Sequence, residues 1–139
     1  MSAKDIFHNA VRSALEKDGW TITDDPLFVK VTTRSEFFID LAAEKLLTAQ
    51  KEERQIAVEV KSFIGRSIIN EFHLALGQFL NYRLALEQVK SQKTLYLAVP
   101  VDTYEVFFPD DFVRQAVATY QMKLLIFNPV KEEIFLWKN

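Results

Sequence analysis

The stretch over residues 94–100, Thr-Leu-Tyr-Leu-Ala-Val-Pro, places the strongest constraint on the fold of this chain. Its apolar residues follow one another without the alternation of a strand that has one solvated face. The run is also far shorter than the roughly 20 residues of a membrane span. We therefore expect a strand that is covered on both faces, within a sheet that carries helices on each side.

The remaining hydrophobic patterns supply elements for such a sheet. Helices are predicted over 5–18, 67–89 and 110–120, and strands over 20–23, 28–31, 36–42, 55–61, 123–127 and 133–137. The helix that starts after Ser67 is apolar around most of its surface, so we expect it to pack centrally. The charged segment 51–54 is expected to be an exposed connection between two neighbouring strands. This order predicts a single α/β domain over residues 1–139, with a central mixed β-sheet flanked by helices.

Composition limits the chemistry that is open to the chain. There is no cysteine, which excludes disulfides, thiolate metal sites and a cysteine nucleophile. The formal net charge is −2, so strong electrostatic binding along a duplex is not expected, although a local basic cleft remains compatible with it. Neither a leader pattern nor a membrane span is present in the sequence, and we expect a cytoplasmic protein without membrane contact.

Two acidic residues and a lysine on predicted strands are the strongest candidates for a functional site. In the strand 55–61, the period of two places Glu59 and Lys61 on the same face. Asp40 lies in an otherwise apolar strand, where a carboxylate is costly unless a cation or hydrogen-bond donors compensate it. Asp40 and Glu59 converge if their strands are neighbours in a suitable register. The alternative is a plain, solvated ion pair between Glu59 and Lys61.

A convergence of carboxylates in this position would suit Mg²⁺ or Mn²⁺. Mg²⁺ prefers a few carboxylate oxygens together with retained waters, and the main-chain carbonyl of Val60 can add a third protein oxygen. Lys61 would position the attacking water or stabilise the charge of a pentavalent phosphate. We predict Asp40, Glu59 and Val60 as metal ligands, and Asp40, Glu59, Lys61 and Gln78 as catalytic residues.

Three polar residues on predicted helices join this candidate site. Gln78 and Tyr82 are four residues apart, on one face of the long helix and in apolar surroundings. Buried polar groups need partners, which the edge of an active site can supply. The alternative is that Gln78 caps a backbone group and that Tyr82 belongs to the core. His8 and Tyr82 are predicted to support the ligating residues from outside the metal sphere, with ordinary packing as the alternative for His8.

Several separated motifs in the chain resemble one known family. These motifs are Ala3-Lys4-Asp5-Ile6-Phe7-His8, Asp18-Gly19-Trp20, Ala57-Val58-Glu59-Val60-Lys61-Ser62-Phe63 and Phe72-His73-Leu74-Ala75-Leu76-Gly77-Gln78-Phe79. In this order they resemble the XisH family of fdxN element excision controlling factors. The resemblance implies a restriction endonuclease-like fold of the PD-(D/E)xK type, with Asp40, Glu59 and Lys61 at the catalytic positions. It also implies a role in developmentally regulated DNA rearrangement during heterocyst differentiation, with a XisI-like protein partner.

Two functions remain open at this point. The chain is either a Mg²⁺-dependent PD-(D/E)xK deoxyribonuclease, an endonuclease that binds DNA, or a catalytically silent module that acts with a XisI-like partner. Many proteins of this fold carry a glutamate on the first helix where this chain has His8, so its metal affinity is expected to differ. The segments 72–86 and 134–137 carry many large apolar residues. We expect some of them to form an exposed patch that supports a homo-oligomer or a hetero-complex.

Overall fold

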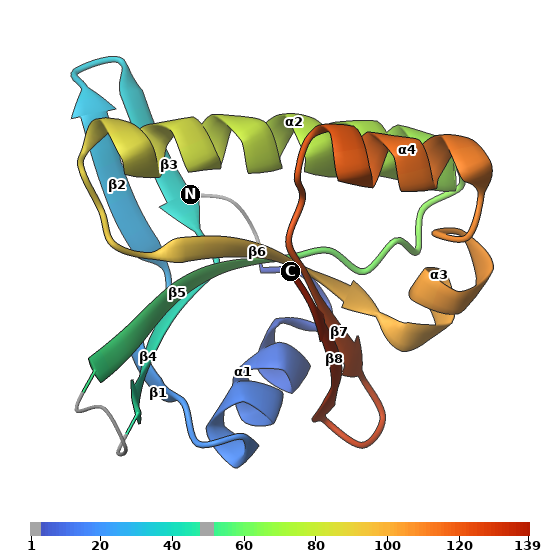
Figure 1. Cartoon of the computed structure of the whole chain (residues 1–139), viewed down its shortest axis with the longest axis horizontal. Coiled ribbons are helices and arrows are strands. Elements are labelled where there is room, and N and C mark those ends of the chain that lie inside the picture. The colour runs from blue at the N-terminus through green and yellow to red at the C-terminus, as the bar shows by residue number, and fades with distance from the viewer. Residues whose placement is uncertain (1–3, 48–51) are drawn as a thin grey trace.

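The protein, seen in a computed structural model that describes residues 4–47 and 52–139, is a six-stranded mixed sheet with helices on both faces (Figure 1). The elements are α1 (His8–Lys17), β1 (Thr21–Asp24), β2 (Leu27–Thr32), β3 (Ser35–Ile39), β4 (Leu41–Leu47), β5 (Glu52–Val60), α2 (Ile68–Gln88), β6 (Thr94–Pro100), α3 (Val101–Val106), α4 (Asp111–Thr119), β7 (Leu124–Asn128) and β8 (Glu133–Lys138). Their order in the sheet is β1-β4-β5-β6-β7-β8, and β2 and β3 form a separate two-stranded sheet. The predicted α/β fold with a helix-flanked mixed sheet is confirmed.

The two faces of the main sheet bury different side chains. Val58 and Val60 of β5 pack with Val11 and Leu15 of α1 on one face. Ala57 of β5 belongs to the cluster of the other face, which α2, the β2–β3 hairpin, α3 and α4 cover. Every residue from 95 to 100 in β6 is buried, as expected for a strand with a helix layer on each side. Among the described residues, no helix is both long and apolar enough to cross a membrane.

The predicted strand 36–42 is wrong as a single element, because Asp40 separates two strands that belong to different sheets. β3 ends at Ile39 and pairs with β2, whereas β4 begins at Leu41 and pairs antiparallel with β5. The chain therefore leaves the hairpin and enters the main sheet at Asp40. The sequence pattern does not reveal this change of sheet. The residues before and after Asp40 are mainly apolar in both cases, because β3 and β4 are each partly buried in their own sheet.

Two further expectations need correction, and one helix was not expected. The expected connection was the charged segment 51–54; its residues 52–54 belong to β5, and residue 51 lies outside the described residues. Backbone pairing continues there, and the charged side chains Lys45 and Arg54, which lie opposite one another, remain partly or fully exposed at this end of the sheet. The helix α2 is a cover and not a central element, since Leu74 and Leu84 are more than half exposed. The short helix α3 was not predicted.

The long helix begins where its N-cap was predicted. Ser67 Oγ accepts a hydrogen bond from the backbone N–H of Asn70 at 3.3 Å, which satisfies one of the free donors of the first turn. The loop between Lys61 and Ser67 carries the chain from the end of β5 to the start of α2. The strand with the candidate residues and the helix that covers it are thus neighbours in sequence and in space.

Candidate functional site

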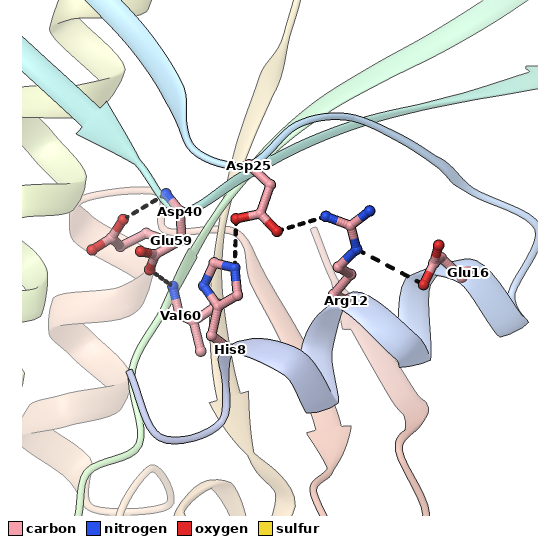
Figure 2. A network of polar contacts seen from close by, with 7 residues as sticks. All are labelled: His8, Arg12, Glu16, Asp25, Asp40, Glu59 and Val60. Carbon is pink, nitrogen blue, oxygen red and sulfur yellow. Dashed lines mark hydrogen bonds and ion pairs between the residues drawn. The ribbon is translucent and has the colours of Figure 1, made fainter. Parts of the chain in front are cut away.

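Asp40 and Glu59 meet at the end of the β4–β5 ladder. Leu41 lies opposite Val58, so the next pair outward along the two antiparallel chains is Asp40 and Glu59. The Asp40 N–H donates to Glu59 Oε1 at 3.3 Å, and the Val60 N–H donates to Asp40 Oδ2 at 2.7 Å (Figure 2). Each carboxyl group therefore accepts a hydrogen bond from a backbone N–H of the neighbouring segment. Glu59 accepts from the residue before β4, and Asp40 accepts from the last residue of β5.

Lys61 joins the acid pair from the residue that follows β5. Its Nζ lies 3.6 Å from Glu59 Oε2, and its side chain is 21% exposed compared with 7% for Glu59. The backbone N–H of Lys61 donates to the Ala98 carbonyl at 3.1 Å and so extends the pairing with β6 by one residue. The alternation along β5 places both side chains on one side, as the sequence predicted. The ion pair is real but it is not a solvated surface contact, because Glu59 is buried.

The environment of the two acids disfavours their ionised forms. Burial raises the pKa of Glu59 to about 8, and the negative charge of Asp40 adds to this effect while Lys61 opposes it. Burial also raises the pKa of Asp40, against the hydrogen bond from Val60 and the nearby charge of Lys61. Two adjacent carboxyls with raised pKa values are poorly compensated by the protein itself. A cation placed between them would reverse both shifts.

Tyr82 of α2 approaches the acid pair from the covering helix, and Gln78 lies on the same face of that helix. Burial raises the Tyr82 pKa to about 12, and the charges of Glu59 and Asp40 contribute further, which places the hydroxyl within their field. The Tyr82 ring also packs on Phe37 of β3, with 5.7 Å between the ring centroids. Gln78 lies one turn earlier on the same face, and its Oε1 is buried without a hydrogen-bond partner. The alternative of a backbone cap by this oxygen is not what the structure shows.

His8 approaches from α1, the helix on the other face of the sheet. It is 3% exposed, and its Nε2 lies 2.7 Å from Asp25 Oδ1. Arg12 Nη1 donates to Asp25 Oδ2 at 2.6 Å, and Arg12 Nε lies 4.0 Å from Glu16 Oε1 (Figure 2). Sequence reasoning missed Asp25 and Arg12. Asp25 stands in an Asp-Asp-Pro turn, and nothing in that pattern shows that it faces a histidine 17 residues earlier.

The residues present fit a hydrated divalent cation. In a strand, the N–H and C=O of one residue point to the same neighbour, so the Val60 carbonyl points toward the side of Asp40. Within residues 4–47 and 52–139, no group of three or more His, Asp or Glu side chains is placed to hold a metal ion together. Two carboxylates with one carbonyl and retained waters match the preference of Mg²⁺. A surface hollow lies elsewhere, and its lining includes residues of α2, α3, α4, β7 and the C-terminus.

Comparison with known proteins identifies the family. The family model described as XisH protein matches residues 1–135. The chain belongs to the XisH family. A crystal structure of an XisH family protein from Nostoc punctiforme PCC 73102 is 48% identical, with a TM-score of 0.87, and the match covers 97% of this chain and 100% of that one. No curated protein matches the chain.

A second solved structure carries a functional description. It is that of an fdxN element excision controlling factor protein from Anabaena variabilis, 47% identical with a TM-score of 0.87. The match covers 98% of this chain and 100% of that chain. The likeness extends over the whole architecture, including the strands that carry the acid pair. The XisH resemblance expected from the motifs is confirmed.

Proposed function

We propose that this XisH protein binds Mg²⁺ or Mn²⁺ at Asp40 and Glu59 and hydrolyses phosphodiester bonds in DNA, as proteins with a PD-(D/E)xK site do. The observation that carries the proposal is the acid pair at the end of β4 and β5, in which Glu59 is buried and Asp40 half-buried, with Lys61 3.6 Å from Glu59. A structural ion pair between Glu59 and Lys61 does not need a second carboxyl beside it. The description of the Anabaena variabilis relative as an excision controlling factor favours DNA as the substrate.

The roles follow from the chemistry of each side chain. Asp40, Glu59 and the Val60 carbonyl would hold the cation, which supplies an activated water and charge neutralisation at phosphate. Lys61 lies beside Glu59 and would stabilise the negative charge that develops on the phosphate oxygens. The unpartnered Gln78 Oε1 and the Tyr82 hydroxyl offer polar contacts to water or to substrate from the covering helix.

A plasmid-nicking assay tests this function. The wild type is expected to nick supercoiled DNA with Mn²⁺ or Mg²⁺ and to lose this activity with EDTA. Lys61→Ala is expected to slow nicking by at least about 100-fold, since loss of one group that stabilises developing charge has effects of this size. Lys131→Ala is the matched control, because Lys131 is exposed in the turn before β8. A rate that is equal in the wild type and in Lys61→Ala would contradict the nuclease proposal.

A second function is favoured by a different observation. Leu74 and Leu84 on the outer face of α2 are 59% and 53% exposed, and Phe135 of the edge strand β8 is 58% exposed. Large apolar side chains in such positions are typical of protein contacts. We propose a XisI-like protein as the partner, as the family resemblance implies, in a complex that does not require cleavage.

Light scattering with gel filtration distinguishes the two outcomes. The isolated protein is expected to self-associate in the micromolar range, or to form a stable complex when a XisI-like protein is added. Leu74→Glu with Leu84→Glu is expected to abolish the association without lowering thermal stability, because both side chains are exposed. A wild type that stays monomeric and does not bind the XisI-like protein would contradict this second proposal and leave the nuclease proposal intact.

A further inference from the structure

The contacts of His8 leave one of its ring nitrogens, Nδ1, without a hydrogen-bond partner. Among the described residues, only two buried side-chain polar atoms have no hydrogen-bond partner, His8 Nδ1 and Gln78 Oε1. They come from opposite faces of the sheet, since His8 belongs to α1 and Gln78 to α2. Buried polar atoms without partners are rare and require an explanation. A hydrated cation at Asp40 and Glu59 would supply donors to both, because the waters of Mg²⁺ are strong hydrogen-bond donors.

Asp25 and Arg12 determine which His8 nitrogen is free. Asp25 uses Oδ2 for the Arg12 guanidinium at 2.6 Å, and Oδ1 for His8 Nε2 at 2.7 Å. An ionised carboxylate only accepts hydrogen bonds, so Nε2 must carry the proton. In the neutral ring, Nδ1 is then an acceptor. Figure 2 shows this chain of contacts from α1 through Asp25, with the ring beside Val60 and Asp40.

We infer that His8 is a positioning residue that accepts a hydrogen bond at Nδ1 from a water on the cation, and that Asp25 and Arg12 fix the ring for this purpose. This inference rests on the cation site of the proposed function. Direct ligation by Nδ1 is disfavoured, because His8, Asp40 and Glu59 are not placed as a three-residue metal group in the part of the chain described. Mg²⁺ also prefers oxygen ligands and retains its waters.

Two substitutions at His8 separate the two ring nitrogens. In His8→Gln, the amide can replace Nε2 at Asp25 but offers no acceptor at the position of Nδ1. In His8→Asn, the shorter amide can replace Nδ1 but does not reach Asp25. We expect His8→Gln to weaken Mg²⁺ binding, measured by calorimetry, by about tenfold, as outer partners of metal sites commonly do. His8→Asn is expected to bind Mg²⁺ more tightly than His8→Gln even if it is the less stable protein.

Asp25→Asn provides a variant that keeps the shape of the contact. Arg12 can only donate, so the amide oxygen turns to Arg12 and the amide NH₂ faces His8 Nε2. The ring must then carry its proton on Nδ1, which can no longer accept from water. We expect this variant to fold and to bind Mg²⁺ about as weakly as His8→Gln does.

Nitrogen NMR of the histidine rings reports which ring nitrogen carries the proton and whether its chemical shift responds to Mg²⁺. If His8 had only a structural role, the shift of its Nδ1 would not respond. The chain has two histidines, and His73 is exposed on α2 and serves as the internal control. With saturating Mg²⁺ at pH 8, His8 is expected to show a protonated Nε2 and an unprotonated Nδ1 that shifts on Mg²⁺ addition, while His73 does not respond. In Asp25→Asn, the two His8 nitrogens are expected to exchange roles.

The outcomes distinguish this inference from the proposed function. Wild-type protein that binds Mg²⁺, combined with unchanged affinity in His8→Gln and no shift at Nδ1, would overturn the role of His8 and leave the cation site standing. Absence of Mg²⁺ binding to the wild type would overturn the cation site and the role of His8 together. Weakened binding in His8→Gln with the predicted nitrogen shifts would support both.

Discussion

Two carboxylate centres at one end of the sheet differ in how the protein compensates them. Burial raises the pKa of Asp25, but the hydrogen bonds from Arg12 and His8 outweigh it, and the pKa lies below its usual value. At Asp40 and Glu59, burial dominates and both pKa values are raised. The contacts of Asp25 with Arg12 and His8 outweigh its burial, whereas Lys61 does not outweigh the burial of Asp40 and Glu59. Charge balance, more than the presence of acidic residues, therefore distinguishes a structural contact from a candidate site.

The largest expected difference between the two centres is that a divalent cation at Asp40 and Glu59 stabilises the folded protein. Mg²⁺ that binds the native state alone should raise the free energy of unfolding by about 2.7 kcal/mol when it is present at 100 times its dissociation constant. Thermal melts with increasing Mg²⁺ measure this effect. Glu59→Gln is expected to remove it, and Asp111→Asn, at an exposed position of α4, serves as the control. A Glu59→Gln protein that gains the same stability from Mg²⁺ would show that the acid pair is not the cation site.

Loss of the Asp25 carboxylate should lower the free energy of unfolding even without metal. Asp25→Ala leaves the buried His8 Nε2 without its acceptor, and we expect a loss of about 2 kcal/mol in the free energy of unfolding, within the usual cost of an unpaired buried group. Urea unfolding at pH 7 measures it. Asp111→Ala removes an exposed ion pair to Arg114 and should cost less than about 1 kcal/mol. Equal losses in the two variants would mean that the Asp25 contacts are no more than surface ion pairs.

The pH dependence of stability should have opposite signs at the two centres. Glu59 has a pKa of about 8 in the folded protein, whereas the unfolded carboxyl ionises near about 4.3. Between these values the folded state binds more protons, so stability falls as pH rises, by up to about 1.4 kcal/mol per pH unit for one proton. Asp25 has a lowered pKa, so its contribution is present above the unfolded pKa and is lost as pH falls through the folded pKa.

Thermal melts between pH 5 and 8 separate these contributions. Glu59→Gln is expected to flatten the decline between about pH 5 and pH 8, because the amide cannot ionise. Asp25→Asn is expected to leave that decline in place and to change the profile only toward lower pH. The same slope in Glu59→Gln and the wild type would show that Glu59 ionises normally in the folded protein.

Local patterns predicted most of the fold, because each depends on neighbours in the chain. The apolar run of β6 showed that the sheet is covered on both faces, and Ser67 predicted the start of α2. The change of sheet at Asp40 was not predictable in this way. Both strands around it continue the same apolar pattern, and only the pairing partners of β3 and β4 differ.

The candidate site was predictable to the extent that its residues follow strand or helix periodicity. Glu59 and Lys61 share a face because they are two residues apart, and Gln78 and Tyr82 share a face because they are four apart. Asp25 and Arg12 were missed, since their contacts with His8 depend on how α1 lies against the turn before β2. Such contacts arise only from the packing of the whole domain.

The smallest expected effect concerns Asp40→Asn. The amide oxygen can still accept the hydrogen bond from the Val60 N–H, and the negative charge that opposes ionisation of Glu59 disappears. We therefore expect the free energy of unfolding at pH 7 to stay within about 0.5 kcal/mol of the wild type or to rise slightly, as for substitutions that preserve shape and contacts. The same variant should lose most of its stabilisation by Mg²⁺, because one of the two carboxylates proposed to bind the cation is gone. Thermal melts of the variant and the wild type with and without Mg²⁺ test both expectations. An Asp40→Asn protein that melts lower than the wild type and still responds fully to Mg²⁺ would place Asp40 with Asp25 among the structural carboxylates, and the contrast between the two centres would no longer hold.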